Sequence, residues 1–371
     1  MSKVTISTLI SIFNVDKLIK PFLVTLLKRF KHLRVLNFHR ASLDELPDEM
    51  GNLFHLKYLS LGDTKVKTIP KSIGKLPNLR ADIRYSLVNE LPSEINKLRK
   101  LRHLLGFSYE KNSFHGVRIQ GGVGELSELH ALSMVKARSS GGRLMMDLEK
   151  LTQMRQLGIS ELNRETGRAT YNIFQNPIFA AWEYLALQGK LEKLPSWIPE
   201  LKNLQKLALS CARLTDEPLT SLKDMPHLVY LNLDAAYGGE ELHFEKCGFQ
   251  KLKELNLKNL RRLKLVKIDV GALSLLEKLE IGPSHELKEV PNDFTNLGKL
   301  KYLDIWGMPT EFAAATKPGG LNIQKIKHVA HVRYWRKQGD GNYVEDKLPL
   351  SHPLRPNLGG GNYIRGGYGY G

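Results

Sequence analysis

Cysteine is scarce in this chain of 371 residues, which contains only Cys211 and Cys247. Two cysteines cannot form a disulfide framework, and such low usage fits a reducing compartment. The glycosylation pattern N-x-[ST] is absent from the whole sequence, which favours the cytosol over secretion. No apolar run reaches the roughly 18 residues that a membrane helix needs. The short apolar start "MSKVTISTLISIF" lacks a cleavage signature. We therefore expect a cytoplasmic protein without a membrane span.

Motifs for catalysis and for cofactor binding are also missing. There is no phosphate loop, because "SIGKLP" and "NLGKLK" lack its glycine spacing and its hydroxyl. No nucleophile elbow, catalytic triad spacing or dinucleotide fingerprint occurs. His328 and His331 have H-x-x-H spacing but no carboxylate or cysteine partner nearby in the pattern. The sequence therefore predicts a protein that is no enzyme and holds no cofactor and no metal.

Acidic residues are too few to balance the basic ones, and the net charge is +17. Residues 1–110 contain 19 Lys and Arg against 10 Asp and Glu, a net charge of +9. Residues 111–316 contain 27 against 25, net +2, and residues 317–371 contain 9 against 3, net +6. Nucleic-acid binders more often show one continuous basic stripe. Two basic ends around a balanced middle suggest acidic partners, or a solvated surface with no partner.

What the chain has in abundance is a repeated leucine pattern. The stretch "GNLFHLKYLSLGDTKVKTIPKSIGKLPNL" (51–79) returns to its start after 23 residues, and an L-x-L core recurs along the chain. Its pairs are Leu36/Phe38, Leu59/Leu61, Leu132/Met134, Leu157/Ile159, Leu185/Leu187, Leu207/Leu209, Leu231/Leu233, Leu255/Leu257, Leu279/Ile281 and Leu303/Ile305. The last five begin 24 residues apart, and degenerate copies bring the expected number of repeats to about twelve. Such a period is the signature of a solenoid.

Each repeat predicts one short strand and one return segment. L-x-L is the period-2 alternation of a strand with one buried face, and the Leu-Pro and Ile-Pro corners that follow end ladder pairing. Because no unit can bury its apolar side alone, stacked units share a core. The predicted fold is thus an α/β leucine-rich-repeat solenoid, a horseshoe with a parallel concave sheet. Thr64, Ser86 and Ser284 occupy a slot where a small polar residue bonds loop backbone.

The pattern also predicts domain bounds and irregular places. We expect an N-terminal partial repeat or cap at 1–32, repeats at 33–309, a cap at 310–345 with "VRYWRK" as an edge strand, and a disordered Gly/Tyr-rich tail at 346–371. One residue is missing between Leu79 and Ile83, so we expect a local distortion there. Residues 106–124 and 137–147 are rich in glycine and serine and predict protruding loops.

The motifs "LLKRFKHLRVLNF" (26–38), "VNELPSEINKLRKLRHLL" (88–105), "LQGKLEKLPSWIPELKNL" (187–204) and "LKEVPNDFTNLGKLKYLDIWGMPTEF" (287–312) carry a more specific resemblance. Together with 51–76, 148–159 and 248–257 they resemble the leucine-rich-repeat region of plant intracellular coiled-coil nucleotide-binding disease resistance proteins, over roughly residues 5–340. Those receptors carry a coiled coil and a nucleotide-binding domain ahead of the repeats, and these 371 residues contain neither. The family usually has one more repeat between Ile159 and Leu185.

The resemblance implies a module of plant innate immunity that senses a pathogen effector or a guarded host protein. Its basic first repeats would dock on a nucleotide-binding domain supplied in trans. The alternatives are an intracellular signalling scaffold without an immune role and, less favoured, nucleic-acid binding through the basic ends.

Positions that point away from the core predict the binding surfaces. For the concave surface we expect exposed aromatic side chains and neighbouring carboxylates to contact the partner: Tyr58, Asp63, Tyr184, Tyr230, Asp234, Tyr302, Asp304 and Trp306. For the basic docking surface we expect Lys57, Lys65, Lys67, Lys71, Lys75, Arg80 and Arg84. The alternation further predicts that Leu231 lies in the core, while Asn232 contributes little to stability.

Overall fold

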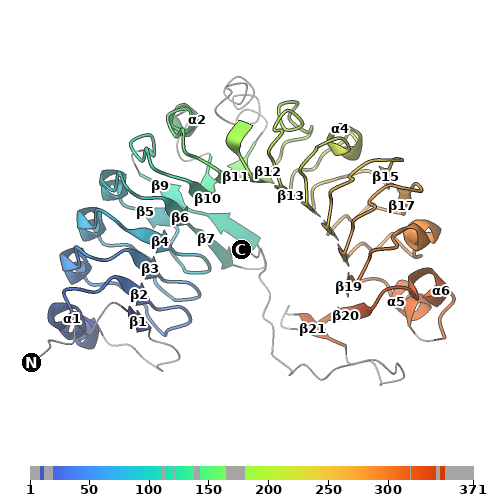
Figure 1. Cartoon of the computed structure of the whole chain (residues 1–371). Coiled ribbons are helices and arrows are strands. Elements are labelled where there is room, and N and C mark those ends of the chain that lie inside the picture. Colours follow the sequence, from blue (N-terminus) through green and yellow to red (C-terminus); the bar gives the residue numbers. More distant parts are fainter. Residues whose placement is uncertain are drawn as a thin grey trace, which may run out of the picture. The chain divides into compact units, whose positions relative to one another are not determined.

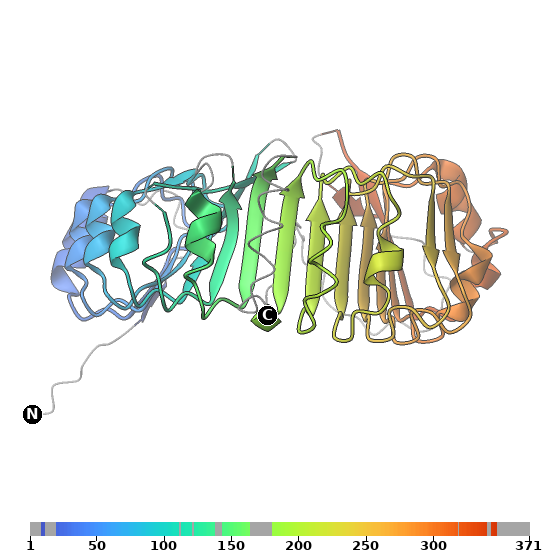
Figure 2. The ribbon, with the colours of Figure 1, turned by 90° about the horizontal axis from the view of Figure 1, so that it is seen from above.

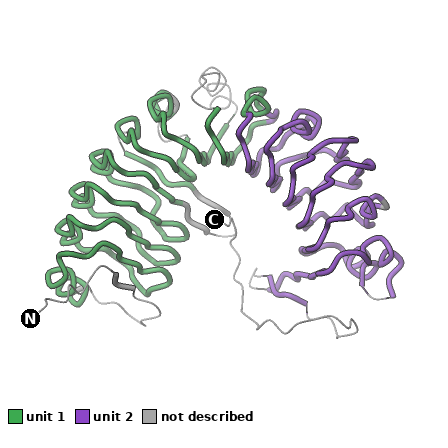
Figure 3. Tube along the Cα trace, viewed as in Figure 1, with its two compact units in different colours: residues 1–191, 195–201 green, residues 192–194, 202–371 purple. Residues whose placement is uncertain are grey.

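The computed structural model describes residues 9–11, 20–110, 113–120, 122–137, 143–163, 180–317, 319–339 and 343–346. The chain divides into two compact units, shown in Figure 3: unit 1 comprises residues 1–191 and 195–201, and unit 2 comprises residues 192–194 and 202–371. Each unit has a main sheet on one side, turns and short helices on the other, and a leucine core between them (Figure 1). The domain bounds expected from the sequence stay predictions.

The main sheet of unit 1 is parallel, and its strands follow chain order. The strands are β1 (Leu9–Ser11), β2 (Val35–Asn37), β3 (Tyr58–Ser60), β4 (Arg80–Asp82), β6 (His103–Leu105), β10 (Ala131–Lys136), β11 (Gln156–Leu162) and β12 (Tyr184–Gly189). The opposite side carries α1 (Lys20–Arg29), the 3-10 turns η1 (Asp48–Asn52), η2 (Lys71–Lys75) and η3 (Ser93–Lys97), and α2 (Arg143–Leu148). Smaller pairs are β5 (Glu90–Leu91) with β9 (Arg118–Ile119), and β7 (Phe107–Glu110) with β8 (Ser113–Gly116).

Unit 2 repeats the same architecture. Its main sheet contains β13 (Lys206–Ser210), β14 (Tyr230–Asp234), β16 (Glu254–Lys258), β18 (Lys278–Ile281), β19 (Tyr302–Trp306), β20 (His331–Lys337) and β21 (Tyr343–Glu345). Figure 2 shows its neighbouring strands side by side. The opposite side carries α4 (Leu219–Leu222), the parallel pair β15 (Glu241–Phe244) and β17 (Leu265–Ile268), η6 (Asn292–Asn296), α5 (Thr310–Thr316) and α6 (Ile323–Ile326).

The leucine pattern explains the core of both units. Leu231 and Leu233 are fully buried, as are the paired leucines of the neighbouring strands, because alternate residues of a strand point to the same face. The predicted fold, a leucine-rich-repeat solenoid with a parallel sheet, is thereby confirmed. Asn232 lies on the other face yet is only 2% exposed, so we no longer expect it to contribute little to stability. Neighbouring strands only about 4.8 Å apart crowd a short side chain there.

The proline corners start the return segments as expected. Pro47, Pro70, Pro92 and Pro291 each precede a 3-10 turn with an extended backbone, which suits the φ that proline imposes. Successive turns pack very closely, because a Cβ added to Gly51 would lie 2.6 Å from the Cβ of Ser72. The glycine in "IGKL"-type corners is therefore a packing requirement.

The predicted polar slot is occupied unevenly. The hydroxyl of Thr64 donates to the carbonyl of Leu61 at 2.7 Å, and that of Ser86 donates to the carbonyl of Ile83 at 2.7 Å. These two bonds confirm the slot. Ser284 is also fully buried, but its Oγ has no hydrogen-bond partner among the residues that the structure describes.

The short repeat around Leu79 is not distorted. Strand β4 pairs with β3 in plain register, with Ala81 opposite Leu59, and Ala81 and Ile83 fill the core positions. The missing residue is absorbed before the strand, so the expected face exchange does not occur. Register shifts lie instead between β10 and β11 and between β11 and β12.

The interval between Ile159 and Leu185 leaves no gap in the sheet, because Leu157 of β11 pairs directly with Leu185 of β12. Residues 164–179 of the interval lie outside the described residues. The loops expected at 106–124 and 137–147 are also partly wrong. The first contains the hairpin β7–β8, whose alternating aromatic residues favour strands, and the second contains the start of α2.

The segment at 310–345 contains α5, α6, β20 and β21. The hydroxyl of Tyr334 in β20 donates to the carbonyl of Thr316 at the end of α5 at 2.9 Å. The stretch "VRYWRK" belongs to β20, which lies between β19 and β21, so the prediction that it forms an edge strand is wrong. Residues 347–371 of the predicted tail lie outside the described residues.

Candidate binding surface

Strand register arranges the outward side chains of unit 2 in three rows that cross the sheet. We call this side of each main sheet the strand face. The first row is Tyr230, Glu254, Lys278, Tyr302 and His331; the second is Asn232, Asn256, Glu280, Asp304 and Arg333. The third is Asp234, Lys258, Gly282, Trp306 and Trp335. Because the repeats share one strand register, side chains that differ from repeat to repeat lie next to one another in each row.

The middle row of unit 2 is polar but buried. Glu280 is 4% exposed and accepts ion pairs from Lys258 at 2.5 Å and from Lys278 at 2.6 Å. Burial alone would raise the pKa of Glu280, but the two lysines outweigh it and lower the pKa to about 2. Both lysine charges are therefore neutralised within the sheet and are not free to attract a partner.

Asp304 is fully buried beneath the same face, although the sequence predicted that it would contact a partner. Arg333 donates to it with both Nε, at 2.5 Å to Oδ1, and Nη2, at 2.6 Å to Oδ2. Trp335 adds its Nε1 at 3.3 Å. A carboxylate held this way anchors β20 to β19, which is a structural role.

Trp306 is also less available than the sequence suggested, at 7% exposed. Its ring stacks on Trp335 with centroids 4.6 Å apart, and Tyr343 packs edge-on at 5.3 Å. On the other side the Nζ of Lys258 lies 4.8 Å from the ring centroid. Gly282 occupies the row position in between, where an added Cβ would clash with the carbonyl oxygen of Trp306. No local sequence pattern indicates these covering neighbours.

Among the described residues of unit 2, Tyr302 is the large aromatic residue that is exposed, at 42%. It stacks on His331 with centroids 4.9 Å apart and an interplanar angle of 13°. Tyr230, in the same row, is half-buried and accepts a hydrogen bond from Asn256 at 3.0 Å. Asp234 accepts a hydrogen bond from Asn259 at 2.6 Å. Burial raises the pKa of Asp234, although this hydrogen bond and the charge of Lys258 act to lower it.

The predicted contact residues of unit 1 differ in their exposure. Tyr58 is half-buried, with the guanidinium of Arg80 6.0 Å from its ring centroid. Asp63 is exposed and pairs with Arg40 at 3.3 Å. Tyr184 is only 5% exposed, so the expected exposure is wrong for it as it is for Asp304 and Trp306.

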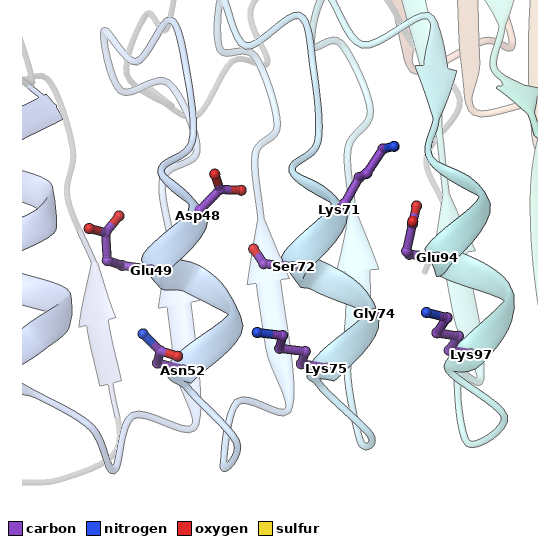
Figure 4. A pocket seen from close by; sticks show the side chains of 9 residues that line it. All are labelled: Asp48, Glu49, Asn52, Lys71, Ser72, Gly74, Lys75, Glu94 and Lys97. Atoms are coloured by element: carbon purple, nitrogen blue, oxygen red, sulfur yellow. The ribbon is translucent and has the colours of Figure 1, made fainter.

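The seven predicted docking cations do not form one surface. Lys57 and Arg80 stand exposed at the strand starts, and Arg84 follows β4 and binds Asp82 with two bonds, at 2.9 and 2.8 Å. Lys71 and Lys75 belong to η2 on the opposite side, where they border a shallow cavity of about 500 Å³ together with Asp48, Glu49, Asn52, Ser72, Gly74, Glu94 and Lys97 (Figure 4). Lys65 and Lys67 lie on the connection between the two sides.

Sequence reasoning missed other basic residues that the structure brings together. Arg34, Arg102, His130 and Arg155 precede their strands at the position that Lys57 has before β3. Each of these residues stands one position before a strand, so the sequence contained the pattern. The pattern becomes recognisable only once the strand register is known. Within the described residues no helix is long and apolar enough to cross a membrane. No group of three or more His, Cys, Asp or Glu side chains in that part of the chain is placed to hold a metal ion.

Known proteins with the same repeat pattern match this chain. The family model "Leucine-rich repeat region" covers residues 11–176. Disease resistance protein RPM1 of Arabidopsis thaliana is 30% identical over 223 residues, which is 60% of this chain and 24% of RPM1. Disease resistance protein RPP8 of the same plant is 25% identical over 336 residues, covering 81% of this chain and 36% of RPP8. The chain thus spans about a quarter to just over a third of the length of these relatives.

Among solved structures, the leucine-rich-repeat ectodomain of the Arabidopsis receptor kinase HAESA covers 84% of this chain and 51% of its own. Its sequence identity is 17% and its TM-score is 0.45, which is too loose to bear on function. The chain is a leucine-rich-repeat protein homologous to plant disease resistance proteins.

Proposed function

We propose that this chain is a non-enzymatic protein-recognition module of plant innate immunity that acts in the cytoplasm. It binds a pathogen effector or a guarded host protein through its strand face. The homology to disease resistance proteins supports the setting. The main support is the composition of the strand face. There the exposed, stacked pair of Tyr302 and His331 lies beside charged side chains that already form ion pairs.

That composition favours a protein ligand in unit 2. Exposed tyrosine is among the residues that most often dominate interface energy, and Tyr302 is held in place by its stack on His331. Because Lys278 is paired with Glu280, and Lys301 with Glu277 at 2.9 Å, this part of the face attracts few counter-charges. Shape and aromatic contact, rather than steering by charge, then determine affinity.

Unit 1 has a different surface, and we assign it a different partner. Its basic strand starts dock an acidic surface, such as that of a nucleotide-binding domain supplied in trans. Two other candidate functions are a signalling scaffold without an immune role, and nucleic-acid binding. A salt titration separates the last from the rest, because phosphate contacts give a steep salt slope.

Quantitative affinity capture from infected plant tissue tests the proposal. The parent chain is compared with Tyr302→Ala/His331→Ala on the strand face and with Val270→Ala, a residue on the opposite side that is 73% exposed. We expect at least one plant or pathogen protein that the parent and Val270→Ala retain and the strand-face variant loses. Capture that is equally sensitive to both variants would contradict the proposal.

A further inference from the structure

A row of basic side chains, five Lys or Arg and one His, crosses the strand starts of unit 1. The N–H of Lys57 donates to the carbonyl of Arg34 at 2.7 Å, and that of Arg80 donates to Lys57 at 2.8 Å. The N–H of His130 likewise donates to Arg102, and that of Arg155 to His130, each at 2.8 Å. The two halves join where β4 pairs with β6. We call Arg34, Lys57, Arg80, Arg102, His130 and Arg155 the basic row.

Little in unit 1 neutralises this row. Arg102 pairs with Glu128 at 3.4 Å, and Arg155 donates to the carbonyl of Ala181 at 3.4 Å. None of the ion pairs found among the described residues includes Arg34, Lys57 or Arg80, and all three are exposed. Like charges on neighbouring strands repel one another, so an acidic ligand would relieve a cost that the free protein carries.

His103 reports the resulting positive potential. Its ring stacks on His130 with centroids 6.2 Å apart, and its Nδ1 is buried without a partner in the described part of the chain. Burial first, and then the charges of Arg80, His130 and Arg102, lower the pKa of His103 to about 4. The guanidinium groups of Arg80 and Arg102 thus add to the effect of burial on this ring.

We propose that the basic row binds an extended acidic peptide segment of about seven or eight residues. The row spans five strand spacings of about 4.8 Å, or about 24 Å, and an extended chain covers about 3.3 Å per residue. Carboxylates suit guanidinium groups, which can bind them with two parallel bonds. Three arginines of the row, Arg34, Arg80 and Arg102, are exposed and can turn toward such a segment.

A single-stranded nucleic acid fits the row less well. Such ligands need aromatic platforms on which bases stack. Beside Arg34, Lys57 and Arg80, the aromatic side chain at the strand starts is Tyr58. It is half-buried, and the guanidinium of Arg80 lies 6.0 Å from its ring centroid. The inference deepens the docking part of the proposed function, because it gives the chemistry of the docked segment. It leaves ligand recognition by Tyr302 untouched, since that pair lies in unit 2.

Fluorescence anisotropy with the full chain and a labelled eight-residue Glu peptide tests the inference. We expect Arg34→Glu/Lys57→Glu to weaken binding of the peptide by about tenfold or more at low salt, with the loss shrinking as salt screens the charges. The matched control is Lys71→Glu/Lys75→Glu, which makes the same charge change on the turn side of the same unit. It should change the affinity by about twofold at most. In NMR titrations the bound peptide should also raise the pKa of His103, because carboxylates would then face it.

Three results would overturn the inference. Equal losses in the two double variants would show that net charge alone attracts the peptide. Tighter binding of a single-stranded oligonucleotide of equal charge would favour nucleic acid. An unchanged His103 titration in saturated complex would place the peptide elsewhere. If the peptide fails while a nucleotide-binding domain still binds, the docking proposal survives and this inference does not.

Discussion

Single residues take their role from alternation along the strand, but crowding modifies that role. Leu231 and Asn232 are neighbours on opposite faces of β14, and both are buried. Leu231 fills the shared core, whereas Asn232 lies in the polar middle row of the strand face. The same residue type would be exposed on an isolated strand, so stability effects at this face depend on the neighbouring repeats.

The first prediction compares three alanine substitutions in unit 2. Leu231→Ala should lower the free energy of unfolding by about 2–5 kcal/mol through transfer and cavity costs. Asn232→Ala should cost about 1–2 kcal/mol, because it removes a buried polar side chain. Glu254→Ala, at an exposed position of the next strand, should cost about 0.5 kcal/mol or less. Denaturant melts with equal effects for the three would contradict the burial pattern.

The second prediction concerns acid stability and Glu280. Its pKa in the folded state, about 2, lies below its ordinary value of 4.5, so folding favours the ionised form. The stabilisation is complete above pH 4.5 and is lost as the pH falls from 4.5 toward 2. Between pH 6 and pH 3 the parent should lose about 2 kcal/mol that Glu280→Gln does not lose. Lys258→Met should move this loss to higher pH, and identical acid midpoints for all three chains would refute the assignment.

Among the elements, β20 closes the described end of the leucine core in unit 2. Its anchor is the ion pair between Arg333 and the fully buried Asp304, assisted by Trp335. The hydroxyl of Tyr334 ties the same strand to α5. These contacts explain why a segment without the leucine period continues the sheet.

The third prediction removes this anchor. Arg333→Met leaves the carboxylate of Asp304 buried and unpaired, which should cost about 3–5 kcal/mol. Arg336→Met, on the same strand, breaks only the exposed pair with Asp346 at 3.1 Å and should cost about 0.5 kcal/mol or less. Denaturant unfolding followed by intrinsic tryptophan fluorescence distinguishes the two variants. A small effect of Arg333→Met would mean that Asp304 is solvated or protonated.

Elements with a strict period could be predicted from sequence, and those fixed by contacts between repeats could not. The strands at Leu207, Leu231, Leu255, Leu279 and Leu303 follow from the 24-residue step, and the 3-10 turns follow from their prolines. The hairpin β7–β8 has no counterpart in the repeat, and its glycines and serines suggested loops. The burial of Trp306 depends on Trp335, 29 positions away, which no local pattern relates to it.

The candidate surfaces were only partly within reach of the sequence. Tyr302 was found because it precedes a core leucine, but its partner His331 belongs to β20, outside the period. The seven cations chosen by density in the sequence divide between two sides, because Lys71 and Lys75 lie in η2. Positions rather than density identify the basic row. Five of its members stand one residue before a strand, and Arg80 opens β4, where the short repeat lacks a residue.

At the scale of the whole molecule, the two units present strand faces of different chemistry. Unit 1 carries a basic row with few carboxylates, whereas Lys258, Lys278 and Lys301 of unit 2 are paired and its open group is an aromatic stack. Charge accelerates the encounter of two proteins, and this effect weakens as salt is added. Aromatic contact slows dissociation, and this effect depends little on salt. One chain can therefore hold two partners by different physical means.

Hydroxyl-radical footprinting of the chain, free and bound to the partner that it captures, tests most directly whether the strand face is the recognition surface. Tyr302 on the strand face and Met146 and Val270 on the opposite sides of the two units are 42%, 58% and 73% exposed, so all three should be oxidised in the free chain. We predict that the bound partner protects Tyr302 strongly and leaves Met146 and Val270 as reactive as before. Protection of Met146 or Val270 with Tyr302 unchanged would contradict the account.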